Sequence, residues 1–203
     1  MPTTITARMV KTLRERTGVG IMECKAALSE SDGKMEDAMT VLRKRGLAQA
    51  AKRAGRTTAQ GVVSSYIHMG GRIGVLVEVN CESDFVARTS DFLDLVKEIS
   101  MHIAAASPKW INREDVPPEI VEQEKAIYRA QLQESNKPAK VLEKIIEGKL
   151  GSFYSQFVLS EQPSIRDSNF TVAQLIAETC AKTGENITID RFTRYRVGEN
   201  APG

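Results

Sequence analysis

The sequence has few cysteines, few aromatic residues and no long uninterrupted apolar run. Its three cysteines, Cys24, Cys81 and Cys180, form no paired set and no Cys-x-x-Cys motif, which argues against a disulfide framework and favours a reducing compartment. No apolar run approaches the length of a membrane-spanning helix, and the first residues lack the apolar core of a signal peptide. We therefore expect a cytoplasmic protein without a membrane partner.

The sequence also has little net charge, +2 over 203 residues. A charge of this size does not require a nucleic acid or an anionic membrane as a partner. Apolar residues make up 41% of the chain and charged residues 27%, as in soluble globular proteins. The length allows one ordinary domain and one small domain.

The motifs of enzyme and nucleotide sites are missing or incomplete. Gly18-Val19-Gly20 follows a predicted helix rather than a strand, and the sequence contains no Gly-x-x-x-x-Gly-Lys-Ser/Thr loop for phosphates. Cys81 beside Glu82 leaves a thiol enzyme open as an alternative, although a cysteine that ends an apolar strand is more often a small buried residue. The two histidines show no metal-ligand spacing. We expect no catalytic residue, no metal and no cofactor.

Residues 1–54 predict a domain of three short helices and a basic helical linker, and residues 55–203 predict a separate core domain. The first helix ends at Gly18, a good left-handed cap residue, and the third stops near Gly46. The apolar positions of these helices recur at helical spacing. They are Ile5, Met9, Val10 and Leu13 in the first helix, Ile21, Cys24 and Leu28 in the second, and Met35, Ala38, Met39 and Leu42 in the third.

The linker is crowded with basic side chains. Its cations are Arg43, Lys44, Arg45, Lys52, Arg53 and Arg56, in a segment rich in alanine and glutamine that closes near Gly55. Clustered cations can meet phosphates, so an RNA- or ribosome-binding module stays open as an alternative. Aromatic residues for base stacking are not interleaved, which favours a solvated linker helix.

The rest of the chain predicts an α+β fold, with a small antiparallel sheet packed by helices on one side. A β-hairpin is expected from residues 62–68 and 73–80, and a closing strand begins at Ile187 and Ile189. The slip of apolar parity between Ile189 and Phe192 indicates a bulge or an early end. Ser90 is expected to cap a helix that ends before Pro108. Further helices are expected from Pro117-Pro118 to about Glu134, after Lys137-Pro138, and over 172–183 up to Gly184. The apolar face of the helix that begins at Ser90 carries Phe92, Leu95, Val96, Ile99 and Ile103.

The stretch from Ile73 to Arg88 begins as a strand and ends as a polar tip that carries a large aromatic residue. Ile73, Val75, Val77 and Val79 share one parity, and therefore one face of a strand. After this strand Ser83 can cap a short helix, and no apolar period explains Phe85. The Phe85 side chain therefore either fills the local core, as most phenylalanines do, or is presented outward.

Two segments resemble known sequence signatures. Asn-Cys-Glu-Ser-Asp-Phe-Val-Ala-Arg at 80–88 resembles the signature of the bacterial elongation factor Ts family, and Leu-Arg-Glu-Arg-Thr-Gly-Val-Gly-Ile-Met-Glu-Cys-Lys-Ala-Ala-Leu at 13–28 is similar to that family's opening signature. The departures are mild: Ser83, Ile21 and Glu23 stand where many members have Thr, Met and Asp. Longer members carry a duplicated core module, and this chain has room for one.

The resemblance implies a function. Members of the family are guanine-nucleotide exchange factors, without covalent chemistry, that bind elongation factor Tu with GDP and promote GDP release by disturbing its Mg²⁺/phosphate site. The short form is expected to pair as a homodimer in the cytoplasm, with no direct nucleic-acid contact. The N-terminal helices are expected to form a ubiquitin-associated-like domain that grips the GTPase domain of the partner.

The resemblance also assigns residues to these roles. Phe85 is expected to wedge into an apolar site on the GTPase while Asp84 disturbs the magnesium side. The residues expected at the magnesium side are Ser83, Asp84, Phe85 and Val86, and those expected in the grip are Leu13, Val19, Gly20, Ile21 and Met22.

Overall fold

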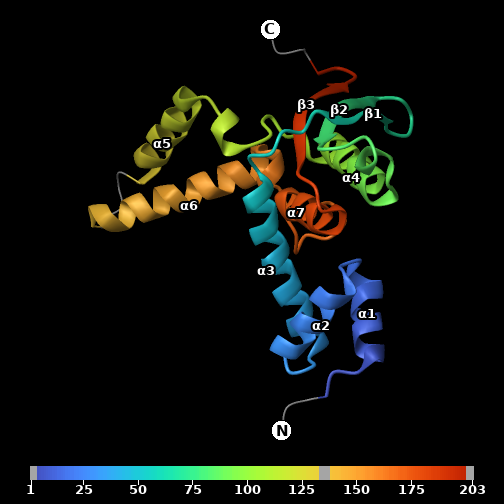
Figure 1. Cartoon of the computed structure of the whole chain (residues 1–203). Coiled ribbons are helices and arrows are strands. Elements are labelled where there is room, and N and C mark those ends of the chain that lie inside the picture. Colours follow the sequence, from blue (N-terminus) through green and yellow to red (C-terminus); the bar gives the residue numbers. More distant parts are fainter. Residues whose placement is uncertain (1–3, 133–137, 200–203) are drawn as a thin grey trace. The chain divides into compact units, whose positions relative to one another are not determined.

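The computed structural model describes residues 4–132 and 138–199, and its fold is α+β, as predicted (Figure 1). Helices precede the first strand of a small sheet and lie between its second and third strands. In chain order the elements are α1 (Ala7–Thr17), α2 (Ile21–Glu30), α3 (Met35–Arg53), β1 (Gln60–Ile67), β2 (Ile73–Cys81), α4 (Ser90–Ala106), α5 (Pro118–Leu132), α6 (Ala139–Phe157), α7 (Val172–Thr183) and β3 (Ile187–Arg196). Single-turn 3-10 helices occur at Val86–Arg88, Arg113–Asp115 and Leu159–Glu161.

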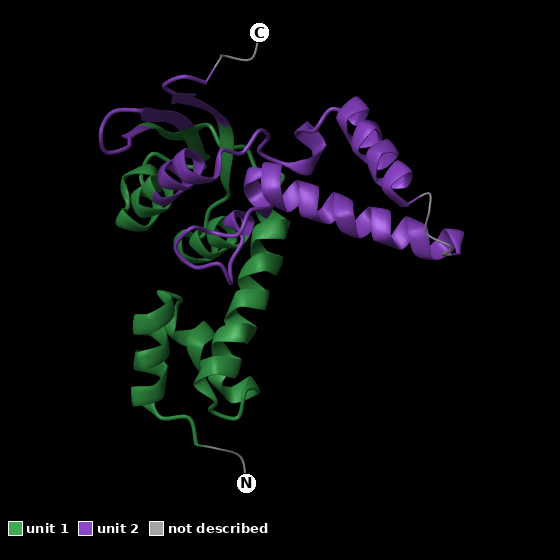
Figure 2. Cartoon of the chain, turned by 180° about the vertical axis from the view of Figure 1, so that it is seen from behind, with its two compact units in different colours: residues 1–64, 78–97, 174–190 green, residues 65–77, 98–173, 191–203 purple. Residues whose placement is uncertain are grey.

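The chain divides into two compact units (Figure 2). The first comprises residues 1–64, 78–97 and 174–190, and the second comprises 65–77, 98–173 and 191–203. Both sequence signatures lie in the first unit. The domain boundary predicted between residues 54 and 55 follows composition rather than these units, and it stays a prediction.

Helices α1, α2 and the first half of α3 form an N-terminal module with its own small core. Leu13, Cys24, Ala27, Leu28 and Ala38 are completely buried in it. Helix α1 ends where the sequence predicts, because Gly18 has a φ of 70° and its N–H donates to the carbonyl of Arg14 at 2.7 Å. The helical periodicity of the sequence thus locates this core correctly.

Helix α3 does not stop near Gly46, and this prediction is wrong. The helix runs without a break to Arg53, so the predicted linker is its second half. A Cβ at Gly46 would lie 3.4 Å from the Cβ of Ala181 and 4.0 Å from the carbonyl oxygen of Ala177. Helix α3 therefore packs against α7 at Gly46 with ordinary van der Waals spacing. This contact offsets a helix-propensity cost of about 1 kcal/mol.

The sheet has the strand order β1-β2-β3 and is antiparallel. On β2, Val75, Val77 and Val79 are buried and Leu76 is exposed, which confirms the predicted parity. The predicted early end of β3 is wrong, since this strand continues to Arg196. The buried parity of β3 changes between Ile189 and Arg194, whose Nε donates to the carbonyl of Ala104 on α4 at 3.1 Å.

Helix α4 buries the predicted face completely or nearly so: Phe92, Leu95, Val96, Ile99 and Ile103 are 0–5% exposed. Its N-terminal cap is one residue earlier than predicted. The hydroxyl of Thr89, rather than that of Ser90, accepts the N–H of Phe92 at 3.4 Å, because the first free N–H groups of α4 point back at Thr89.

Helices α5 and α6 form an antiparallel pair in the second unit (Figure 1). No residue of α5 is buried, in keeping with its many charged side chains. At the end of α6, the ring of Phe153 lies 5.1–6.0 Å from the rings of Trp110, Tyr154 and Phe157. The predicted helix end near Glu134 and the break at Lys137 lie outside the described residues.

Candidate functional site

The tip, residues 82–88, is organised by hydrogen bonds around Ser83. The Cys81 thiol donates to the Ser83 carbonyl across 3.1 Å, and the Ser83 hydroxyl oxygen accepts the N–H of Val86 at 3.3 Å. The N–H of Ala87 also donates to the Ser83 carbonyl at 3.3 Å. The Ser83 hydroxyl and carbonyl therefore accept the first two N–H groups of the short 3-10 helix, whose N-cap residue is Phe85.

Phe85 is presented to solvent at this turn. Its side chain is 77% exposed, whereas the neighbouring Val86 is 5% exposed and anchors the tip. The carboxylate of Asp84 is also exposed and accepts from the Arg88 guanidinium at 3.0 Å. The interpretation in which Phe85 fills the local core is therefore wrong. A phenylalanine is usually buried, so its exposure on a hydrogen-bonded turn makes it a candidate contact residue.

Sequence reasoning missed Glu185, whose carboxylate binds the base of the tip. One oxygen, Oε2, accepts the N–H groups of Glu82 and Ser83 at 3.1 and 3.0 Å, and Oε1 accepts the Ser83 hydroxyl at 2.5 Å. Glu185 follows Gly184, the residue that ends α7, and is 102 positions from Ser83. A pairing over this distance leaves no periodic signal in the sequence.

The second group of predicted site residues lies around the start of α2. Ile21 is 52% exposed and Met22 is 73% exposed, and Gly20 before them is exposed as well. Leu13 is 0% exposed and Val19 is 8% exposed. The assignment of Leu13 as a direct contact is therefore corrected. Its side chain, like that of Val19, packs in the module core and supports the exposed residues.

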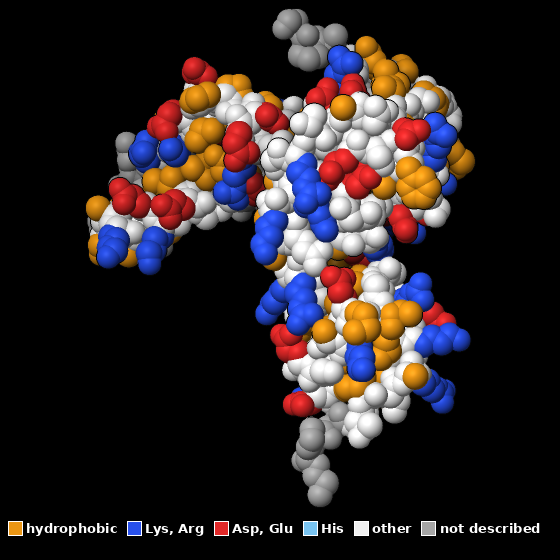
Figure 3. Space-filling model, viewed as in Figure 1, with side chains coloured by type: hydrophobic (Ala, Val, Ile, Leu, Met, Phe, Trp, Pro, Cys, Tyr) orange, Lys and Arg blue, Asp and Glu red, His pale blue; other side chains and the backbone are white. Residues whose placement is uncertain are grey.

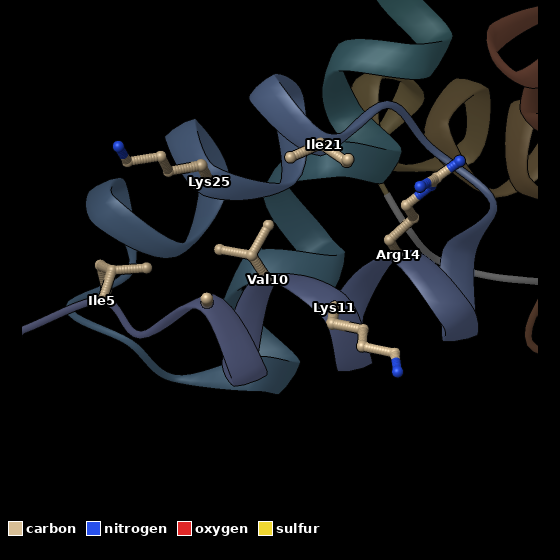
Figure 4. A pocket seen from close by; sticks show the side chains of 7 residues that line it. Ile5, Val10, Lys11, Arg14, Ile21 and Lys25 are labelled. Carbon is tan, nitrogen blue, oxygen red and sulfur yellow. The ribbon is translucent and has the colours of Figure 1, made fainter.

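A groove with an apolar floor and a basic rim lies on the same module. Its lining consists of Ile5, Ala7, Val10, Lys11, Arg14, Ile21 and Lys25. Figure 4 shows the charged ends of Lys11, Arg14 and Lys25 extending outward from the apolar side chains. In Figure 3, hydrophobic side chains gather on this module with Lys and Arg side chains around them. Ile21 thus belongs to a larger apolar surface.

The three thiols are not arranged for catalysis. Cys24, Cys81 and Cys180 are all buried, and burial raises the pKa of each thiol above its ordinary value. A raised pKa lowers the fraction of the reactive thiolate at neutral pH. The geometry therefore disfavours the thiol-enzyme alternative.

Several cations of the basic run are engaged within the chain. Arg45 pairs with Glu30, the guanidinium of Arg53 donates to the carbonyl of Cys180 at 3.3 Å, and that of Arg56 lies 3.4 Å from a carboxylate oxygen of Glu82. The contacts of Arg45 and Arg53 join α3 to α2 and α7, and that of Arg56 joins the segment after α3 to the tip. Arg45, Arg53 and Arg56 therefore have a structural role that does not depend on binding phosphates.

Residues 4–132 and 138–199 hold neither a cluster of metal ligands nor a membrane-spanning helix. No three His, Cys, Asp or Glu side chains in this part of the chain come together as a metal site. None of the described helices is both long and apolar enough to cross a membrane.

An α+β chain that exposes apolar side chains on a three-helix module and on a hydrogen-bonded tip has the form of a binding protein. Comparison with protein families identifies one family. The sequence model described as Elongation factor TS matches residues 4–199, and the chain belongs to this family of translation elongation factors.

Individual relatives agree over nearly the whole chain. The chain is 57% identical over 195 residues to Elongation factor Ts of Fervidobacterium nodosum, a match that covers 96% of this chain and 99% of that protein. It is 55% identical to the proteins of the same name from Thermosipho melanesiensis and Koribacter versatilis, with 96% of this chain and 100% and 89% of those proteins covered. The family resemblance seen in the two signatures is thus confirmed.

Proposed function

We propose that the chain is a guanine-nucleotide exchange factor that binds elongation factor Tu with GDP and promotes GDP release. The observation that carries the proposal is Phe85, 77% exposed on a supported tip, in a member of the elongation factor Ts family. The chain acts in the cytoplasm by binding alone and performs no covalent chemistry. Its partner is a GTPase and not a nucleic acid.

Exchange of this kind requires differential binding. The chain must bind the nucleotide-free GTPase more tightly than the GDP-bound one, and the coupling is reciprocal. Weakening GDP by about 10⁴-fold requires roughly 5.5 kcal/mol of differential interaction. Burial of one phenylalanine supplies about 1.5–3 kcal/mol, so additional contacts must hold the aromatic in place.

The two exposed surfaces of the first unit supply these contacts in the proposal. Phe85 enters an apolar site on the GTPase and Asp84 disturbs the support of the Mg²⁺ ion, which bridges the phosphates of the bound nucleotide. Ser83 and Val86 hold the tip. Ile21 and Met22 grip the GTPase domain from the N-terminal module, which we propose to be a ubiquitin-associated-like domain within residues 1–54.

The direct test is the release of a fluorescent GDP analogue from elongation factor Tu, with and without the full chain. We expect the chain to accelerate release and Phe85→Ala to remove most of the acceleration at matched concentration. Leu93→Ala is the control, because Leu93 on α4 is also apolar and 46% exposed but lies outside both signatures. Equal rates for Phe85→Ala and the unmodified chain would falsify the proposed role of the tip.

The outer face of the sheet supports a homodimer. Leu76 on β2 is 51% exposed, and Ile67 on β1 is 64% exposed. A Cβ added at Gly74 would lie 3.1 Å from Cδ1 of Ile67, so the Ile67 side chain lies over Gly74. Gly74 and Leu76 have the same parity on β2, and Ile67 and Leu76 therefore share one face of the sheet. An exposed apolar sheet face of this kind is typical of an interaction surface. We propose that a second copy of the chain covers it.

Sedimentation at micromolar concentration tests this second point. Leu76→Lys places a charge on the sheet face and should convert a dimer into a monomer. Leu93→Lys adds the same charge at an exposed leucine of α4 and should leave the dimer intact. A chain that sediments as a monomer without any substitution would contradict the proposal.

A further inference from the structure

We infer that Glu185 is a positioning residue for the tip, which acts on nucleotide exchange by holding Phe85 and Asp84 in the orientation that meets the GTPase. The inference rests on the proposed function of the tip, and it adds a residue that lies outside both signatures. Glu185 touches neither Phe85 nor the partner in this role. It acts through Ser83.

The carboxylate of Glu185 accepts three hydrogen bonds from two consecutive residues of the tip. It accepts two consecutive N–H groups, those of Glu82 and Ser83, through one oxygen, and the Ser83 hydroxyl through the other. Hydrogen bonds to an ionised carboxylate are roughly twice as strong as neutral ones. Three such bonds join Glu82 and Ser83 to the Glu185 carboxylate. Glu185 therefore sets the direction in which the chain leaves β2.

The contact is reciprocal, which fixes both partners. The carboxylate of Glu82 accepts the N–H of Asn186 at 2.7 Å, while the Asn186 amide donates to the carbonyl of Arg56 at 3.0 Å. The Arg56 guanidinium in turn lies 3.4 Å from the carboxylate of Glu82. Segments 82–83 and 185–186 thus exchange side-chain to backbone bonds, and Asn186 is itself buried.

Ser83 transmits this position to Phe85. Its hydroxyl donates to Glu185 and accepts the N–H of Val86, so a single rotamer serves both contacts. Phe85 lies between Ser83 and Val86 and has no burial of its own to orient it, since its ring is mostly in solvent. Without Glu185, the hydroxyl loses its acceptor and the turn that presents the ring loses three of its bonds.

A mobile tip can still bind, but its ordering against the partner has a larger entropic cost. The effect should therefore appear in the rate of GDP release, since the groove on the N-terminal module is unchanged. A misplacement of about 1 Å in a positioned group can cost on the order of a hundredfold. We expect Glu185→Ala to slow accelerated release by about tenfold or more.

The experiment compares Glu185→Ala with Glu161→Ala in the full chain. Glu161 is a matched control, because its carboxylate binds the Arg113 guanidinium and it belongs to the second unit, whereas the tip belongs to the first. Release of a fluorescent GDP analogue from elongation factor Tu gives the rate, and amide hydrogen exchange of residues 82–87 in the free chain reports on the tip. Glu185→Gln keeps an oxygen for both N–H groups and an amide that can donate to Ser83, so it should recover most of the rate and of the protection.

A double mutant separates this inference from the proposed function. If Glu185 acts through Phe85, Glu185→Ala should slow release in the unmodified chain and add little in a Phe85→Ala background. An equal additional loss in both backgrounds would overturn the positioning role, as would unchanged amide protection at 82–87. If Phe85→Ala alone leaves release unchanged, the proposed function of the tip fails, and the amide protection then still decides whether Glu185 holds the tip.

Discussion

The tip and the N-terminal module both present apolar side chains to solvent, but they support them by different physical means. At the tip, Phe85 is held by a turn whose hydrogen bonds converge on Glu185. On the module, Ile21 and Met22 are held by α2, which buries Cys24 and Leu28 in a small core. One support is polar and local in space, and the other is apolar and shared by three helices.

This difference determines how each surface fails. An apolar core loses stability whenever a buried side chain is truncated, because a cavity remains. A hydrogen-bonded turn tolerates loss of the side chain that it presents, since no cavity forms, but it fails when its acceptor is removed. Stability measurements should therefore detect damage to the module, and rate measurements should detect damage to the tip.

The largest expected effect separates two phenylalanines of one unit. Phe92 is 0% exposed and Phe85 is 77% exposed. Phe92→Ala should lower the free energy of unfolding by about 3–5 kcal/mol, whereas Phe85→Ala should change it by less than about 0.5 kcal/mol. Denaturant unfolding of the two variants measures the contrast. Comparable losses for both would mean that the tip is part of the core.

The next effect compares two residues of the opening signature. Leu13→Ala should destabilise the module by about 2–5 kcal/mol, because its side chain is completely buried. Met22→Ala removes a side chain that is 73% exposed and should instead weaken binding to elongation factor Tu with little loss of stability. Circular dichroism melting and titration calorimetry measure the two quantities. A melting temperature that collapses in Met22→Ala, with unchanged affinity per folded molecule, would remove the contact assignment.

A buried polar pair in the second unit extends the comparison to pH. His102 is 1% exposed, its Nε2 lies 2.8 Å from Oε1 of Gln162, and burial lowers its pKa below the ordinary 6.5. The unfolded chain therefore takes up a proton at a higher pH than the folded chain does. Stability should be complete above pH 6.5 and should fall as the pH drops below it, by at most about 1.4 kcal/mol per pH unit.

Unfolding at pH 7.5, 6.5 and 5.5 checks this dependence. His102→Gln removes the titrating group and should flatten the profile between these values. His68→Gln is the matched control, since His68 is exposed and hydrogen-bonded to Tyr66. Identical slopes in all three chains would assign the pH dependence to other groups.

A small change in stability is also expected for Asp84. Its ion pair with Arg88 is exposed, and such pairs contribute about 0.2–1 kcal/mol. Asp84→Ala should barely alter unfolding yet slow GDP release, because the proposal gives its carboxylate a role against the partner's Mg²⁺ site. Arg88→Ala breaks the same pair and keeps the carboxylate, so it should retain exchange activity. Equal slowing by both variants would point to the ion pair instead.

Parts of the fold could be read from local patterns. The parity of Val75, Val77 and Val79 and the helical face of α4 were correct because burial on one side imposes a fixed period on consecutive residues. The left-handed cap at Gly18 was correct because glycine adopts that backbone conformation readily. Thr89 replaced the neighbouring Ser90 as the cap of α4, an error of one residue that local chemistry alone does not resolve.

Other features depend on segments that meet only in the folded chain. Gly46 was mistaken for a helix end, although it lies inside α3 where α7 comes close. Leu13 belongs to a signature, but whether it is a contact or a support follows from the burial of its side chain. The sequence by itself determined the elements, their inner faces and the family, because these depend on periodicity and short motifs. Only the tertiary structure decided that Phe85 faces solvent and that Glu185 holds its turn, because those facts arise from contacts between residues about a hundred positions apart.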